Sequence, residues 1–387
     1  MGSVSSHSRV THGRASAPVG TSAASVSKSR LEDFHPGWFG AVMGTGVVGI
    51  AAYLNPGHAA GTAGGFEWFG ELMTITAAAL GIALGVPYVA RWFRQPAATR
   101  RDLHNPLTGA LYGTFPGGVL VLGAAAALVG PSIVGVGTAR ALDAAFAWVG
   151  VPLAFAISVI FAQLLFARSE IDHEVINGSW FIPPVVNIVV PMTLLPLIPG
   201  SSPATARLLL LASYGFWGMG FFLFVVVLAT LHHRLVNHPL PHAGLASTLW
   251  IPLGPLGVGA LTLMKMADAS GAVFGASGSS IQQLSLVAAS AMWGFGIWWL
   301  TIAIATLVRY LSQGPLPYGP GWWAFIFPLG AFTVADLSVA RAWQTGLIEW
   351  FGFGLFVLLV LSWLVVAVTS VKFVVAKGRR HDAAPRS

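Results

Sequence analysis

The sequence contains no cysteine, which excludes disulfide bonds, thiolate metal sites and cysteine nucleophiles. Charge is also scarce, because Asp, Glu, Lys and Arg make up 9% of the 387 residues, against about 25% in soluble domains. The chain is instead 55% hydrophobic, with a mean hydropathy of +0.75. Apolar runs long enough to cross a bilayer recur along its length. This composition predicts an all-α polytopic membrane protein.

The two ends of the chain differ from the region between them. Residues 1–34 are rich in Ser, Ala and Gly, with no acidic residue before Glu32 and no apolar run typical of a secretory signal. We expect a disordered N-terminal tail over 1–34, a membrane domain over 35–376 and a short C-terminal tail over 377–387.

Apolar runs between polar breaks predict ten membrane spans, each long enough for a hydrocarbon core of about 30 Å. They are residues 36–55, 67–93, 106–130, 139–167, 179–199, 206–232, 246–266, 281–310, 319–340 and 346–376. With a cytoplasmic N-terminus, only four of the 20 Lys and Arg residues lie outside: Arg140, Arg207, Lys265 and Arg341. The positive-inside rule therefore predicts a multi-pass protein of the plasma membrane with both termini in the cytoplasm.

The odd-numbered spans carry helix-breaking residues in a common register. Gly44, Pro116, Pro183, Pro252 and Pro328 recur at intervals of 72, 67, 69 and 76 residues. A second set of small or rigid residues follows them closely: Gly46, Gly118, Pro184, Gly254 and Gly330. Proline kinks a helix, and freed backbone groups in lipid need protein or water to satisfy them. The register predicts one hairpin repeated five times, in a quasi-five-fold ring whose kinked odd spans line a central pore.

One glycine motif within this repeat has another possible meaning. Residues 44–49, "GTGVVG", match the G-x-G-x-x-G pattern of dinucleotide-binding folds. That fingerprint must follow a strand and open the helix of a βαβ unit. Here it lies inside an apolar span, so we interpret the match as accidental.

Two inner segments, "HPGWFGAVMGTGVVGIAAY" (35–53) and "PGWWAFIFPLGAFTVA" (320–335), resemble the tellurite-resistance/dicarboxylate transporter family. That family includes bacterial tellurite-resistance proteins, fungal malate permeases and sulfite exporters, and plant slow anion channels. The resemblance implies an anion pathway in each protomer, a homotrimer, and a phenylalanine on the ninth helix that blocks the pore. The matching residue is Phe327, and its repeat counterpart Phe115 is predicted to add a second aromatic layer.

Few polar side chains lie in the inner spans. Thr45, Thr114, Asn187 and Thr333 are candidate anion contacts, although Asn187 could equally form a hydrogen bond between helices. His35 lies at the mouth of the first span, where it could sense pH or present charge to an anion. Asp336 is expected near a rim, paired with Arg341 or solvated.

The remaining sequence features bound the function. The histidines form no ligand cluster, so we expect no metal and no cofactor. We predict transport of small anions, foremost C4-dicarboxylates such as malate, with sulfite, tellurite or other inorganic anions as alternatives. A membrane-embedded enzyme would need clustered carboxylates or histidines, and a non-conducting scaffold would not explain the registered breaks. The expected partners are an anionic substrate and the lipid bilayer, with no nucleic acid.

Overall fold

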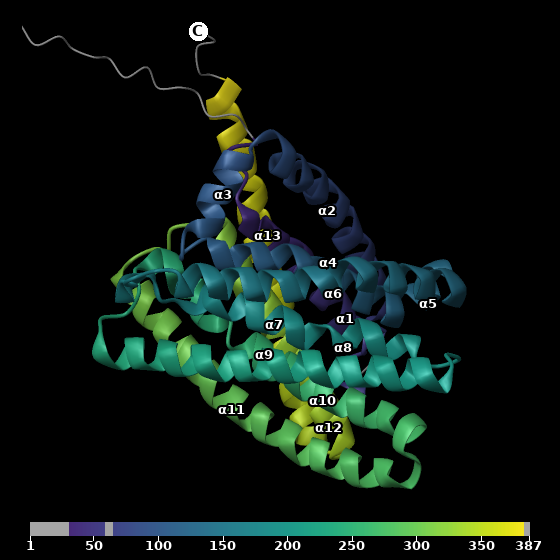
Figure 1. Cartoon of the computed structure of the whole chain (residues 1–387). Helices are drawn as coiled ribbons and strands as arrows, with labels where there is room; N and C mark the ends of the chain where they lie inside the picture. Colours follow the sequence, from purple (N-terminus) through teal and green to yellow (C-terminus); the bar gives the residue numbers. More distant parts are fainter. Residues whose placement is uncertain (1–30, 59–64, 383–387) are drawn as a thin grey trace, which may run out of the picture.

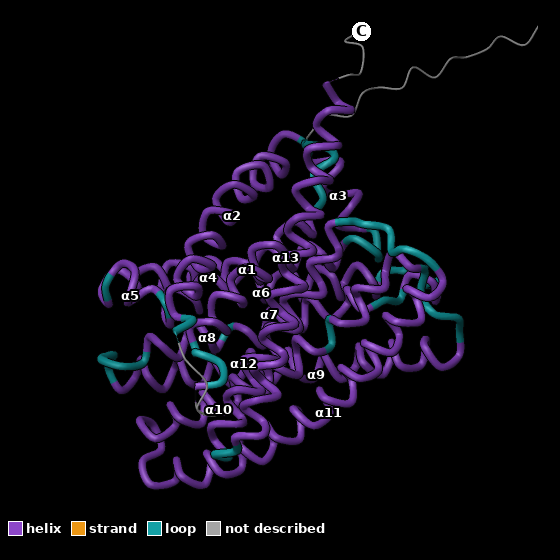
Figure 2. Tube along the Cα trace, turned by 180° about the vertical axis from the view of Figure 1, so that it is seen from behind, coloured by secondary structure: helices purple, strands orange, loops and turns teal. Residues whose placement is uncertain are grey.

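A computed structural model describes residues 31–58 and 65–382 (Figure 1). Most of the predicted N-terminal tail, residues 1–30, lies outside this range. None of the described residues forms a strand, and most of them belong to helices (Figure 2). The last helix continues to Asp382, through the start of the predicted C-terminal tail.

Helices of two kinds alternate along the chain. The inner segments each begin with a 3₁₀ helix and continue as an α-helix: η1 (Pro36–Phe39) and α1 (Gly40–Tyr53), η3 (Gly109–Gly113) and α4 (Thr114–Leu128), η5 (Gly178–Phe181) and α7 (Ile182–Val189), η7 (Ala243–Trp250) and α10 (Leu253–Phe274), η9 (Pro320–Phe325) and α12 (Ile326–Ala342). The outer helices are α2 (Glu67–Arg94), α6 (Val136–Phe166), α9 (Pro203–Asn237), α11 (Gly278–Gln313) and α13 (Gly346–Asp382).

Short elements connect these helices or extend them. They are α3 (Pro96–His104), α5 (Gly130–Val134), η4 (His173–Val175), α8 (Pro191–Leu194), η6 (Leu195–Leu197) and η8 (Gly275–Ser277). Within the described residues, nine helical segments are long and apolar enough to cross a membrane. They correspond to nine of the ten predicted spans. The other predicted span is η1 with α1, which is not among the nine.

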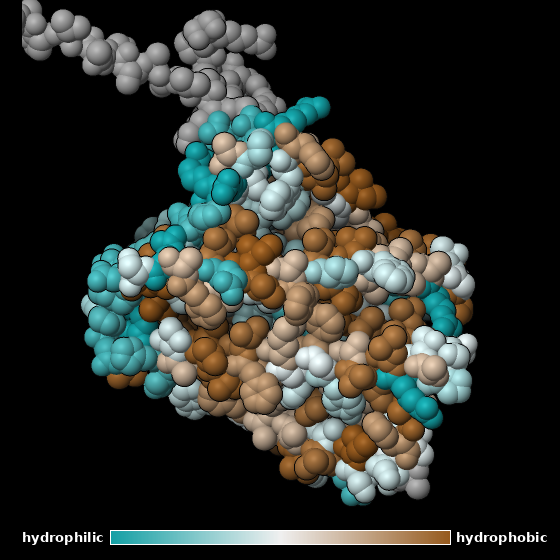
Figure 3. Space-filling view, in the orientation of Figure 1, coloured by the Kyte–Doolittle hydropathy of each residue, from teal (hydrophilic) through white to brown (hydrophobic). Residues whose placement is uncertain are grey.

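Burial separates the two kinds of helix. The four inner segments among the nine are 78–89% buried over their most apolar windows, whereas the five outer helices are only 17–28% buried. Of the 14 residues of α1, all but Tyr53 are buried, so α1 belongs to the inner set. Hydrophobic side chains cover much of the outer surface in Figure 3, and polar ones gather toward its edges. The predicted division into inner odd spans and outer even spans is confirmed.

The five hairpins close into a ring. Helix α1 packs on α4, α4 on α7, α7 on α10, α10 on α12, and α12 back on α1. Their 3₁₀ segments form a second closed ring in the same order, so all five inner helices begin at one end of the bundle. Each outer helix also contacts the next inner helix around the ring. The quasi-five-fold arrangement predicted from the repeat is therefore present.

The prediction that the breaking prolines kink the inner helices is wrong in its mechanism. Pro116, Pro183 and Pro328 lie within the first three residues of their α-helices, Pro184 is the third residue of α7, and Pro252 caps α10. The first turn of an α-helix has no intrahelical acceptor for its N–H groups, so a proline there costs no hydrogen bond. These prolines instead mark the change from 3₁₀ to α geometry.

Polar contacts close the ring between its first and last hairpins at three levels. Arg341 donates to Glu349 at 3.0 Å and to the carbonyl of Leu54 at 2.7 Å. Trp363 Nε1 donates to Thr45 Oγ1 at 3.0 Å. At the far end Lys377 Nζ lies 3.1 Å from Asp33 Oδ2. The end of the bundle that holds Asp33 and Lys377 is called the termini side below.

This arrangement corrects the prediction for Asp336. It does not pair with Arg341, whose partner is the buried Glu349. Asp336 is fully buried behind the inner ring, and its Oδ1 accepts a 2.6 Å hydrogen bond from Trp293 Nε1 on α11. The other oxygen of Asp336, Oδ2, lies beside Gly352 of α13, where a Cβ would be only 2.5 Å from it. Asp336 therefore joins an inner helix to its outer neighbours instead of lying solvated at a rim.

Candidate functional site

The termini side carries the N-terminal ends of all five inner helices, because their 3₁₀ segments contact one another in a closed ring. A helix N-terminus has a partial positive charge from unpaired N–H groups and the helix dipole. Five such ends around one axis favour an anion over a cation at this mouth. This field comes from backbone groups and needs no Lys or Arg within the ring.

A constriction forms where the first turns of the inner helices meet. An ideal Cβ on Gly117 of α4 would lie 2.8 Å from Met43 Sδ on α1 and 3.0 Å from Val186 Cγ1 on α7. A residue that meets both neighbouring helices of the ring in this way faces the ring axis. Met43 is buried, with 3% of its surface exposed. The termini-side turns of α1, α4 and α7 thus meet through apolar groups.

The other side of the constriction is built by α7, α10 and α12. An ideal Cβ on Gly254 of α10 would lie 3.5 Å from Val185 Cγ2 and 3.6 Å from Phe327 Cε1. Phe327 is the second residue of α12 and is 6% exposed. Its ring therefore lies over Gly254, beside Val185 of α7. We call Met43, Gly117, Val185, Val186, Gly254 and Phe327 the constriction.

The repeat counterparts of Phe327 have different surroundings. Phe115 stacks on Tyr88 of the outer helix α2, with ring centroids 4.5 Å apart, and meets Phe39 edge-on at 4.8 Å. These contacts direct its ring toward α2 and away from the constriction. Met43 occupies the same repeat position in α1 and lies in the constriction. The repeat register places Met43 before Gly44 as it places Phe327 before Pro328, but it does not tell which counterpart faces the axis.

The four predicted polar contacts all have protein partners. Thr45 accepts from Trp363, and Thr114 and Thr333 donate to backbone carbonyls at 2.7–2.9 Å. Asn187 Nδ2 donates to Ser158 Oγ on α6 and to the Pro183 carbonyl at 2.7 Å. The structure thus shows the hydrogen bond between helices for Asn187, and its role as an anion contact stays a prediction.

Three of the repeated glycines lie at close helix crossings. An ideal Cβ would lie 2.7 Å from Val121 at Gly46, 3.1 Å from Phe39 at Gly118 and 2.4 Å from Val47 at Gly330. Gly44 likewise faces Trp323 and Ile326 at 3.0–3.1 Å. Small residues let membrane helices approach closely. The structure thus gives these glycines a packing role, and their part in lining a pore stays a prediction.

Three buried donors in the ring of 3₁₀ segments were not anticipated from the sequence, and one of them, Trp323 Nε1 of η9, lines a groove described below. Ser179 Oγ in η5 and Trp250 Nε1 in η7 are buried, and neither has a hydrogen-bond partner. The two segments pack against each other. The sequence does contain an aromatic residue shortly before each break, and this pattern could have pointed to Trp250. These residues are Trp38, Tyr112, Trp180, Trp250 and Trp323.

His35 does not present a positive charge at the mouth. Its Nδ1 accepts a 3.2 Å hydrogen bond from the Gly37 N–H and so caps η1. Burial lowers the pKa of His35 to about 4, and the nearby Asp102 carboxylate only partly opposes this shift, while Arg91 and Lys377 add to it. The imidazole of His35 is therefore neutral at physiological pH. Among the described residues, no cluster of His, Asp and Glu could hold a metal ion.

Comparison with known proteins agrees with this geometry. Residues 33–371 match the profile of the voltage-dependent anion channel (SLAC1) family. An uncharacterised transporter of Methanocaldococcus jannaschii is 33% identical over 346 residues, which cover 88% of this chain and 93% of that protein. A sulfite efflux pump of Trichophyton rubrum is 26% identical over 88% of this chain and 91% of its own length. A malic acid transport protein of Schizosaccharomyces pombe is 23% identical over 59% of this chain and 56% of its own length.

These relatives are transporters or channels and not enzymes. The match covers nearly the whole ring of helices, from the segment before η1 into α13. It also confirms the resemblance seen in residues 35–53 and 320–335. The chain is a multi-pass membrane protein and belongs to the voltage-dependent anion channel (SLAC1) family of anion transporters.

Proposed function

We propose that this chain moves small anions across the plasma membrane along the axis of its inner ring, with Phe327 as the gate. The observation that carries the proposal is the closed ring of five inner helices, which all begin on the termini side. The helix ends favour an anion at that mouth, and the apolar constriction beyond them binds it weakly. Weak binding lets an ion leave as well as enter.

Phe327 suits a gate because of what faces it. Its ring lies against Gly254, which carries no side chain of its own to hold the ring in place. A buried phenyl ring closes a narrow passage by bulk and by excluding water. Met43 is the proposed second element of this gate, in place of Phe115, whose ring is held against α2.

Two candidate anion donors lie on the termini side of the gate. Ser179 and Trp250 each carry a buried donor that has no protein acceptor. A buried unpaired donor costs about 1–3 kcal/mol, which an anion accepting its hydrogen bond would recover. We assign these residues to transient anion binding before the constriction.

For the substrate, C4-dicarboxylates such as malate are the anions predicted first in the sequence analysis. The sulfite efflux pump aligns over more of this chain than the malic acid transport protein does, 88% against 59%. Sulfite and malate are therefore the first two anions to test, with tellurite and chloride as further inorganic candidates. The distribution of Lys and Arg supports a cytoplasmic termini side, and the family resemblance supports a homotrimer.

The test is flux from proteoliposomes loaded with sulfite, malate, tellurite or chloride. We expect flux of at least one anion and no flux of sodium or potassium. Trp250→Phe should raise the anion concentration that gives half-maximal flux, while the protein remains folded. The matched control is Trp298→Phe on the lipid-facing α11. Flux of none of these anions, even after the gate is truncated, would favour a scaffold.

A further inference from the structure

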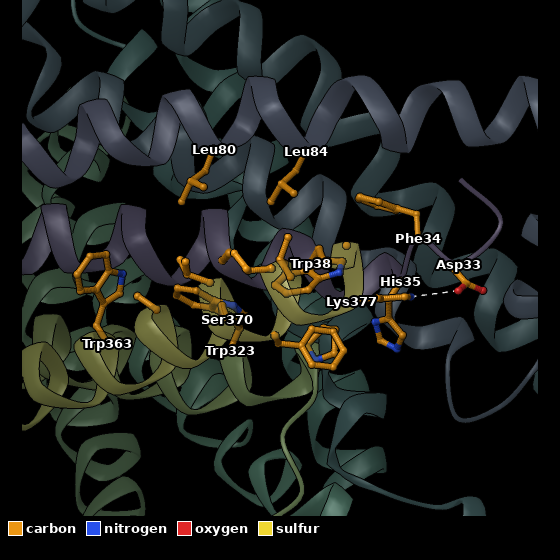
Figure 4. A pocket seen from close by; sticks show the side chains of 18 of the residues that line it. Asp33, Phe34, His35, Trp38, Leu80, Leu84, Trp323, Trp363, Ser370 and Lys377 are labelled. Carbon is orange, nitrogen blue, oxygen red and sulfur yellow. Dashed lines mark ion pairs between the residues drawn. The ribbon is translucent and has the colours of Figure 1, made fainter. Parts of the chain in front are cut away.

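A large groove opens between the first and last hairpins, on the outer side of the ring. It encloses about 770 Å³ and is lined by α2, η1, α1, η9 and α13 (Figure 4). This volume lies within the range of about 300–1,000 Å³ typical of pockets that bury drug-sized ligands. The groove is separate from the constriction, none of whose residues line it.

The walls of the groove are apolar along most of its length. Leu80 and Leu84 of α2 point into the groove from one side, with Trp38 and Trp363 across from them (Figure 4), and Ala367 of α13 also lines it. Both α2 and α13 are membrane-spanning helices with little of their surface buried. The solvent next to such a groove is lipid, so hydrocarbon is the material available to fill it.

Charged groups gather at one end of the groove. Lys377 and Asp33 form an ion pair there, and His35 lies beside them (Figure 4). Lys372 and Arg379 are exposed on the same last turns of α13, which gives this end a surplus of positive charge. Basic residues at the end of a membrane helix attract anionic headgroups.

The groove wall also contains an unsatisfied donor. Trp323 lines the groove, is 4% exposed, and its indole Nε1 has no hydrogen-bond partner. A tryptophan near a membrane interface typically places its ring in the apolar region and its N–H toward polar lipid atoms. The ester oxygens of a phospholipid lie at that level.

We propose that this groove is a binding site for a membrane phospholipid, with one acyl chain between α2 and α13 and an anionic headgroup at Lys377. The apolar walls accommodate the chain, Trp323 faces the ester region, and the basic turns of α13 select the headgroup. The site also touches the segment that positions the gate, because Trp323 packs on Gly40 and Gly44 of α1 and precedes Phe327 by four residues.

The absence of natural cysteine allows a direct test in the full-length protein. Leu80→Cys places a bimane label in the groove, and Ile82→Cys places one on the same helix, at a side chain that is 72% exposed. Both proteins are reconstituted in vesicles that contain increasing fractions of phospholipid with brominated acyl chains. The brominated lipid carries either an anionic phosphatidylglycerol or a zwitterionic phosphatidylcholine headgroup.

We expect quenching at position 80 to saturate at a several-fold lower fraction of brominated phosphatidylglycerol than at position 82. Brominated phosphatidylcholine should show a smaller difference between the two positions. Lys377→Gln should remove the headgroup preference at position 80 and leave position 82 unchanged. Ala367→Phe, which fills the groove, should make the quenching curves at positions 80 and 82 alike.

Three results would overturn the proposal. Identical quenching curves at positions 80 and 82 would show bulk lipid and no site. Quenching absent at position 80 in every mixture would show that protein covers the groove, either a second copy or another segment of this chain. A preference for phosphatidylglycerol that survives Lys377→Gln would contradict the assigned headgroup position. The readout is lipid contact, so it does not depend on the transported anion or on the gate.

Discussion

The inner and outer helices of this protein are both strongly apolar but reach stability in different ways. Inner segments are 78–89% buried and meet at glycines where a methyl group would not fit, as at Gly257, whose Cβ would lie 2.6 Å from the backbone of α12. Outer helices are 17–28% buried, and several of their glycines, such as Gly218, have open space around them. Close packing holds the ring, whereas lipid covers the outer layer.

An apolar composition is expected in both layers of helices. Both kinds of helix must be apolar, because one faces protein and the other faces lipid. Small residues at the inner crossings carry the distinction, since they let backbones approach in a setting where burial of apolar surface gives little driving force. Substitutions that act on one layer and spare the other test the comparison.

The largest effect is expected where the ring closes. Arg341→Gln leaves Glu349, which is 1% exposed, without its charged partner. We expect a loss of about 3 kcal/mol, at the low end of the range for breaking a buried pair because Arg341 is itself 35% exposed. Lys377→Gln breaks an exposed pair at the other end of the same junction and should cost less than about 1 kcal/mol. Unfolding in a denaturing detergent measures both, and equal losses would contradict the comparison.

A second pair of substitutions compares packing in the two layers. Gly257→Ala should cost about 1–3 kcal/mol, because the new methyl group overlaps the backbone of Ala331 and Phe332. Gly218→Ala on the outer helix α9 should change stability by no more than about 0.5 kcal/mol. The midpoint of thermal unfolding in detergent is the measurement. A neutral Gly257→Ala would show that the inner ring is loosely packed.

Asn187 tests whether inner polar groups serve structure or transport. Asn187→Ala removes its hydrogen bonds to Ser158 and Pro183, so we expect a loss of about 1 kcal/mol in stability. The ratio of sulfite to malate flux should stay unchanged. A changed ratio with unchanged stability would return Asn187 to the set of anion contacts.

The smallest effect concerns pH. His35 is neutral in the folded protein because its pKa is lowered to about 4, whereas the unfolded chain takes up a proton near its ordinary pKa of 6.5. The stability contributed by the neutral imidazole of His35 is therefore present above pH 6.5 and is lost as the pH falls toward 4. His35→Asn keeps a cap for η1 and should flatten this part of the pH profile. Parallel thermal profiles for the two proteins would refute this account of His35.

Much of the fold could be predicted from the sequence, because the registered breaks at 44, 116, 183, 252 and 328 report the repeat directly. The direction of individual side chains could not. Phe115 and Phe327 occupy the same repeat position, yet only Phe327 reaches the constriction, since Tyr88 on α2 offers Phe115 a stacking partner. Asp336 appeared to lie at a rim because its partner Trp293 is 43 residues away on another helix.

The prolines show a second limit of sequence reasoning. Each was expected to kink a helix, but the start of an α-helix is not marked in an apolar run that already begins in 3₁₀ geometry. Pro183 and Pro328 therefore looked internal to their spans and lie in first turns. The breaks lie close to the constriction because they mark the first turns of the inner helices.

The most direct test of the central claim compares two repeat-equivalent phenylalanines by anion flux in proteoliposomes. Phe327→Ala removes the ring that lies over Gly254 and should raise flux at least several-fold. Phe115→Ala removes a ring stacked on Tyr88 and should leave flux near that of the unmodified protein, at equal reconstitution. An increase for Phe115→Ala alone, or no increase for Phe327→Ala, would contradict a pathway gated at the axis of the ring.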